Sequence, residues 1–143
     1  MYQRILVATD GSEASKKAGL KGVSLAKESG ALVIGVHILD EDELNIMDVG
    51  ANEYEHLKKE QREKGEKALK SLGELAKSRG IRFKSILGEG EPSEEIIKIA
   101  NEQSADLIIL GPHGRRGLSK LIDPSVSEET QEECPECPIM IML

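Results

Sequence analysis

The stretch "ALVIGVHIL" at residues 31–39 decides the fold class of this 143-residue chain. It is almost wholly aliphatic and lacks the polar alternation of a strand with one solvated face. Four further short runs, most of them rich in Ile, Leu and Val, resemble it: RILVAT (4–9), IRFKSIL (81–87), DLIILG (106–111) and PIMIML (138–143). Such runs are typical of strands that are covered on both faces.

Longer charged segments with helical periodicity separate most of these runs. Apolar or small residues share one face within 12–29, 54–79 and 93–104, and those of the first segment are small enough to pack closely on a sheet. Gly30 and Gly80 follow the first two segments, where a left-handed residue ends a helix.

Strands that alternate with helices predict a parallel sheet with helices on both faces. We expect one α/β domain over residues 1–143, doubly wound around five strands in the order 3-2-1-4-5. Such sheets bind ligands beyond the carboxyl ends of their strands. Residues 40–53 (DEDELNIMDVGANE) fit no element and predict an acidic, mobile loop over that edge.

Composition and charge exclude several classes of partner. The net charge of −7 and the aromatic fraction of 2% argue against nucleic acid and against an anionic membrane surface. No apolar run approaches the ~18 residues of a membrane span. The first residues also lack the pattern of a signal peptide, so we expect a cytoplasmic protein.

Two loops at the predicted binding edge carry candidate ligand residues. Asp10 follows the first strand, where a carboxylate can accept hydrogen bonds from a ribose diol. Alternatively, Asp10 and Ser12 cap the first helix, and both roles fit together if Ser12 is the cap. After the fourth strand, Gly111 and Gly114 permit close backbone approach and an amide nest for anions. The same loop contains His113, Arg115 and Arg116. These side chains either add positive charge near a ligand or belong to a solvated turn.

The stretch DPSVSEE (123–129) predicts the start of a helix, with Asp123 as N-cap and Pro124 as the first helical residue. A helix N-terminus aimed at the glycine loop favours a phosphate. However, Pro124 offers no N–H and Asp123 adds negative charge, so both oppose a polyanion.

Together these stretches resemble the universal stress protein family over essentially the whole chain. ILVATDGSEAS is similar to its first strand and loop, GVHILDE to its second strand, and CPIMIML to its closing strand. GEGEPSEEIIKIANEQSADLIILGPHGRRGL is similar to its third loop, third helix and fourth strand. The resemblance implies the same doubly wound, Rossmann-like fold and a role in stress response or signalling.

ATP-binding members of that family carry G-x2-G-x9-G-S/T, and this chain departs from the motif at its third glycine, which is Pro124. The resemblance places Asp10 at the ribose and the backbone of Ile38 at the adenine. The remaining implied nucleotide residues belong to the fourth loop and the following helix: Gly111 near the ribose, Gly114 and Ser125 at the phosphates, and Arg115 as a lesser candidate.

The loss of one amide donor at Pro124 removes a charge-assisted hydrogen bond of about 1.5–3 kcal/mol, roughly a ten- to hundredfold loss of affinity. We therefore expect weak binding of ATP or another adenine nucleotide, with Mg²⁺ if the ligand is a triphosphate. The alternative is a protein–protein interaction module of the same fold with a defunct nucleotide site and an unknown protein partner.

No catalytic or metal-ligating residue is predicted. Cys134 and Cys137 fall at the end of a helix, which raises rather than lowers a thiol pKa, so we interpret them as packing residues; the alternative is a redox-active thiol pair. His37 is interpreted as a packed strand or dimer-side residue and His56 as a solvated one. No Ser-His-Asp or paired-carboxylate spacing occurs, and nothing supplies a base for ATP hydrolysis.

The last run, 138–143, has no polar face. A bare edge strand of this kind is an aggregation hazard, and pairing with its twin across a two-fold axis would cover it. The family resemblance implies the same contact, so we expect a homodimer.

Overall fold

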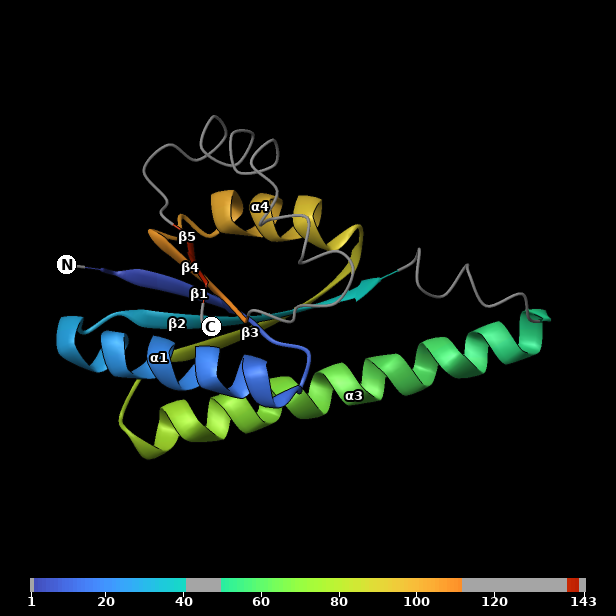
Figure 1. Cartoon of the computed structure of the whole chain (residues 1–143), viewed down its shortest axis with the longest axis horizontal. Coiled ribbons are helices and arrows are strands. Elements are labelled where there is room, and N and C mark those ends of the chain that lie inside the picture. The colour runs from blue at the N-terminus through green and yellow to red at the C-terminus, as the bar shows by residue number, and fades with distance from the viewer. Residues whose placement is uncertain (1, 41–49, 112–138, 142–143) are drawn as a thin grey trace.

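The computed structural model describes residues 2–40, 50–111 and 139–141. The described elements form three layers, with a sheet between helices (Figure 1). They are β1 (Arg4–Ala8), α1 (Glu13–Ser29), β2 (Leu32–Asp40), α3 (Ala51–Ser78), β3 (Phe83–Gly90), α4 (Pro92–Glu102), β4 (Leu107–Leu110) and β5 (Ile139–Ile141). None of the helices in these ranges is long and apolar enough to cross a membrane.

The described strands form a parallel sheet in the order β3-β2-β1-β4-β5, as the sequence predicts. In the register of the sheet, Ile5 of β1 lies between Val33 of β2 and Leu107 of β4. The strands β2 and β3 lie on one side of β1, and the chain then crosses to the other side of β1, where it forms β4. The point at which strand order reverses is therefore beside β1, and the loop after β1 opens onto it.

Both faces of the sheet are covered, with α1 and α3 on one face and α4 on the other (Figure 1). Alternate residues of β1 enter the two cores, since Ile5 and Val7 pack toward α1 and α3, whereas Leu6 packs toward α4. All three side chains are fully buried. This double burial explains why the strand sequences are continuous apolar runs.

The small residues on α1 allow close packing, as predicted. A Cβ at Gly22 would lie 2.5 Å from Cγ2 of Val7, and one at Gly19 would lie 2.9 Å from Cδ1 of Leu72. Only glycine at these positions brings the α1 backbone so near to the sheet and to α3.

The helices α1 and α3 end in the same way. Gly30 and Gly80 have φ of 74° and 71°, in the left-handed region. The amide after each glycine donates back to the preceding helix: Ala31 N to Ala26 O at 3.1 Å, and Ile81 N to Ala76 O at 2.9 Å. The predicted glycine stops are confirmed.

The prediction of a loop across all of 40–53 is wrong at both ends. Asp40 is the last residue of β2 and pairs in register with Gly90, and α3 begins at Ala51. Buried residues of α3 start only at Gly65, because its first half extends beyond the sheet (Figure 1). The segment 54–79 was predicted to be helical, and only residues 51–53 at its start were missed, because the buried face of α3 begins further along the helix.

Candidate functional site

The loop after β1 holds Asp10 in place through the cap of α1. Ser12 Oγ accepts a hydrogen bond from Ser15 N at 3.2 Å, so the predicted cap is confirmed. The Ser12 amide in turn donates to Oδ1 of Asp10 at 2.8 Å. This Asx turn positions a half-buried carboxylate at the carboxyl end of β1.

Thr9 makes the same loop rigid. Its hydroxyl donates to Ser15 Oγ at 3.1 Å and accepts the Gly11 amide at 3.3 Å. Its own amide donates to Val36 O at 2.9 Å, which joins the loop to β2. The backbone around Asp10 is thus fixed by neighbours on both α1 and β2. The sequence analysis did not single out Thr9, because its role depends on contacts that only folding creates.

His37 ties the end of β2 to this loop. The imidazole is buried, and its Nδ1 lies 2.8 Å from the carbonyl oxygen of Thr9. A carbonyl only accepts, so Nδ1 carries the proton. The other side of the ring lies on Gly65 of α3, where a Cβ would overlap Cδ2 and lie 2.8 Å from Nε2. The interpretation of His37 as a packed strand residue is confirmed, and it also supports the site.

A cavity of about 30 Å³ lies at the carboxyl ends of β1 and β2, beside the start of α4. Asp10 and Ile38 both line it, so the structure brings together two of the predicted nucleotide residues. Thr9, His37, Asp40, Gln61 and Pro92 are among its other lining residues. The described residues contain no group of three His, Cys, Asp or Glu side chains that could hold a metal ion.

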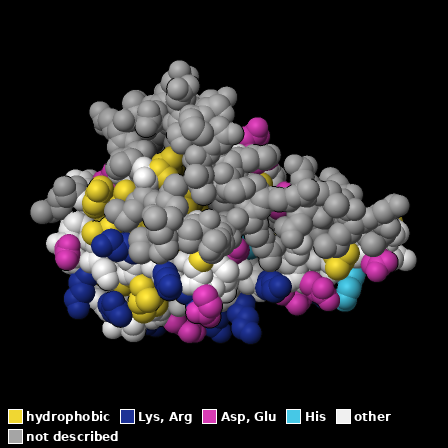
Figure 2. Space-filling model, viewed as in Figure 1, with side chains coloured by type: hydrophobic (Ala, Val, Ile, Leu, Met, Phe, Trp, Pro, Cys, Tyr) yellow, Lys and Arg dark blue, Asp and Glu magenta, His cyan; other side chains and the backbone are white. Residues whose placement is uncertain are grey.

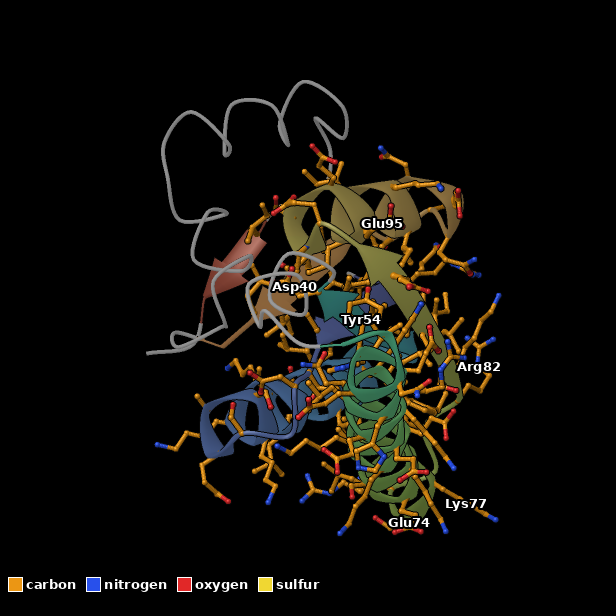
Figure 3. The ribbon with its side chains drawn as sticks, turned by 90° about the vertical axis from the view of Figure 1, so that its right-hand side faces the viewer. Asp40, Tyr54, Glu74, Lys77, Arg82 and Glu95 are labelled. Carbon is orange, nitrogen blue, oxygen red and sulfur yellow. The ribbon has the colours of Figure 1, made fainter. Side chains whose placement is uncertain are left out.

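Asp40 is a site residue that the sequence analysis missed. Its side chain is 6% exposed and lines the same cavity as Asp10. Figure 3 shows Asp40 between α4 and α3. The sequence contained a signal for this role, because Asp40 directly follows the second apolar run just as Asp10 follows the first.

Gly111 follows β4 and is buried at the same edge of the sheet. A Cβ there would lie 3.2 Å from the Ala14 carbonyl carbon and 3.3 Å from Ser15 N, both in the first turn of α1. The close approach that this glycine permits is therefore to a helix backbone. Gly111 does not line the cavity that Asp10 and Ile38 share.

The other predicted residues of the fourth loop and last helix lie outside the described residues. They are Gly114, Arg115 and Ser125, together with His113, Asp123, Pro124, Cys134 and Cys137. The phosphate end of the site thus stays a prediction.

An ion pair at this edge ties the projecting part of α3 to the sheet. Lys58 Nζ lies 2.5 Å from Oε1 of Glu89, near the end of β3. The hydrogen bond to Glu89 raises the pKa of Lys58, because it favours the charged ammonium. His56, two residues before Lys58, is exposed and lies 3.1 Å from Glu60, in agreement with the solvated role expected for it.

Comparison with known proteins gives consistent relatives. The universal stress protein YxiE of Bacillus subtilis is 32% identical over 148 residues, which cover 99% of both chains. The solved structure of MJ0577, a universal stress protein of Methanocaldococcus jannaschii, is 28% identical with a TM-score of 0.79 and covers 99% of this chain and 96% of its own.

A more distant structure has the same fold and a bound ligand. The universal stress protein from Archaeoglobus fulgidus in complex with dAMP is 18% identical, with a TM-score of 0.67, and covers 99% of this chain and 98% of its own. The model of the universal stress protein family matches residues 1–142. The chain therefore belongs to the universal stress protein family.

Proposed function

We propose that this universal stress protein binds an adenine nucleotide at the cavity that Asp10 and Ile38 share. In this proposal the nucleotide controls a stress-response or signalling module of the cytoplasm, and the protein is not an efficient enzyme. The observation that carries the proposal is the convergence of the two residues, 28 positions apart, on one cavity at the strand ends.

Asp10 suits the ribose end of a nucleotide. A carboxylate has about four lone-pair sites, so the Ser12 amide and a ribose diol can share it. Because the cap of α1 and the bonds of Thr9 already hold the loop, little ordering is needed when the ligand binds.

The backbone of β2 suits the adenine end. Register pairs between β1 and β2 stop at Ala8 and Val36, whereas those between β2 and β3 continue to Asp40 and Gly90. The end of β2 thus extends beyond β1, with Ile38 lining the cavity on that side. Main-chain donors and acceptors at such a position can pair with the edge of a purine ring.

The Archaeoglobus fulgidus relative that holds dAMP supports this ligand class, although an identity of 18% indicates shared fold only. The proposal is one of binding and not of turnover. Mg²⁺ would enter only with a triphosphate, through the phosphates themselves.

The size of the cavity favours a second candidate function. About 30 Å³ accommodates a water molecule, whereas small-molecule pockets span roughly 300–1,000 Å³. A nucleotide would therefore have to displace part of the walls. If a nucleotide does not displace these walls, the second candidate holds. The chain is then a homodimeric protein–protein interaction module with a defunct nucleotide site, paired through residues 138–143.

Titration calorimetry with ATP, ADP and AMP tests the proposal. The variant Asp10→Asn keeps an oxygen for the Ser12 amide but loses the charge, so we expect about tenfold weaker binding with an unchanged melting temperature. Glu13→Gln is the matched control, since it removes an exposed carboxylate three residues away. Pro124→Gly should strengthen binding roughly ten- to hundredfold.

Two results would reject the proposal. If millimolar nucleotide gives neither heat nor a thermal shift, the interaction module is favoured. If Asp10→Asn binds as tightly as the unmodified chain, the nucleotide lies elsewhere.

A further inference from the structure

A second and larger cleft lies on the other side of the loop, between α1 and α3. Its volume is about 490 Å³, within the range of small-molecule sites. Thr9, Asp10 and Gly11 form one end, and the walls come from the first two turns of α1 and from residues 64–75 of α3. At 1.5 Å per residue, that part of α3 extends about 16 Å. The cleft is therefore long enough for an extended small molecule.

The charge of this cleft is opposite to that of the protein as a whole. The net charge of the protein is −7. Among the described residues that line the cleft, Asp10 is the only carboxylate, whereas three are lysines: Lys16, Lys64 and Lys67. Lys16 pairs with Glu13 at 3.1 Å. Within the described part of the chain, Lys64 and Lys67 have no ion pair within 4 Å, although Glu60 and Glu63 precede them by one turn.

The other end of the cleft is apolar. Leu20, Leu72 and Leu75 line it, next to Gly19. Leu20 is 43% exposed and is the only large hydrophobic side chain exposed in the described ranges. Figure 2 shows hydrophobic side chains among lysines, arginines and acidic residues on the side of the molecule where α1 lies. The cleft thus changes from cationic to aliphatic along its length.

We propose that this cleft binds a small amphipathic anion, a single aliphatic chain with a carboxylate head. The head lies between Lys64 and Lys67, and the chain lies along Leu20 and Leu75. Neither an uncharged chain nor a bare anion matches both ends of the cleft. This cleft differs from the cavity of the proposed nucleotide site, which lies beside α4, although Thr9 and Asp10 line both.

Calorimetry on the whole protein with decanoate, below its micelle concentration, tests the proposal. We expect saturable binding of one decanoate per chain, and neither decanol nor inorganic phosphate should bind comparably. The double variant Lys64→Gln/Lys67→Gln should bind about five- to tenfold more weakly, as expected for two partly solvated charge contacts. Leu20→Ser should also weaken decanoate, because it removes part of the apolar wall.

The matched control is Lys70→Gln/Lys77→Gln, which removes the same charge from α3 outside this cleft. It should bind decanoate normally.

Three results would overturn the proposal: decanol bound as tightly as decanoate, an equal loss in the control pair, or no saturable heat. Sedimentation with anionic phospholipid vesicles, without binding of decanoate, would identify a membrane surface instead and would also reject a soluble ligand.

Discussion

The contact between Gly65 and His37 gives a sharp test of how the site is built. The variant Gly65→Ala places a methyl group against Cδ2 of the His37 ring, with Nε2 2.8 Å and Cγ 2.9 Å away. The ring cannot simply retreat, because its Nδ1 is bonded to the Thr9 carbonyl at 2.8 Å and the side chain is buried. The substitution must therefore move the ring or α3.

Three effects set the magnitude. Overpacking costs about 1–3 kcal/mol, and the loss of the bond between His37 and Thr9 adds about 0.5–1.5 kcal/mol. Alanine in place of glycine in a helix returns about 1 kcal/mol. The sum predicts that Gly65→Ala lowers the free energy of unfolding by about 0.5–3.5 kcal/mol, even though the substitution favours the helix.

A double-mutant cycle measured by urea denaturation checks this reasoning. In a His37→Ala background the obstructing ring is absent, so Gly65→Ala should raise the free energy of unfolding by about 1 kcal/mol. The change of sign, at an unchanged m-value, isolates the contact between α3 and β2. Additive effects of the two substitutions would refute the argument, because they would mean that the ring does not limit the space at Gly65.

Three further substitutions test the supports of the site and the sheet. Ser12→Ala should lower the free energy of unfolding by about 1 kcal/mol in urea, through the lost cap; an unchanged midpoint would contradict the cap. Gly22→Ala should cost about 1–3 kcal/mol by differential scanning calorimetry, because Val7 is fully buried and stiff at χ1; a higher melting temperature would show that α1 has room. Because Glu89 raises the pKa of Lys58 above its ordinary 10.5, the pair stabilises the fold below that pH and is lost as the pH rises through the raised value. In thermal melts the unmodified chain should lose more stability above about pH 10.5 than Lys58→Met, and parallel curves would contradict the pair.

Asp10 was predicted from its place after the first strand, whereas Ile38 was implied by the family resemblance. In a parallel sheet the carboxyl ends of neighbouring strands meet at one edge, and this brings the two residues to one cavity. We assigned Asp40 to a loop, because a carboxylate next to three further acidic residues is typical of a solvated segment. Its burial depends on the pairing of β2 with β3, and β3 lies more than forty residues further along the chain.

Local chemistry explains what the sequence determined by itself: the strands, the cap at Ser12 and the glycine stops at Gly30 and Gly80. Each of these features depends on residues within one or two helical turns of it, so a short stretch of sequence is enough to predict it. The tertiary structure alone decided that His37 rests on Gly65, that Gly111 faces a helix backbone, and that the cavity beside Asp10 is small. These features depend on where two distant segments come to rest, and that position follows from the packing of whole helices on the sheet.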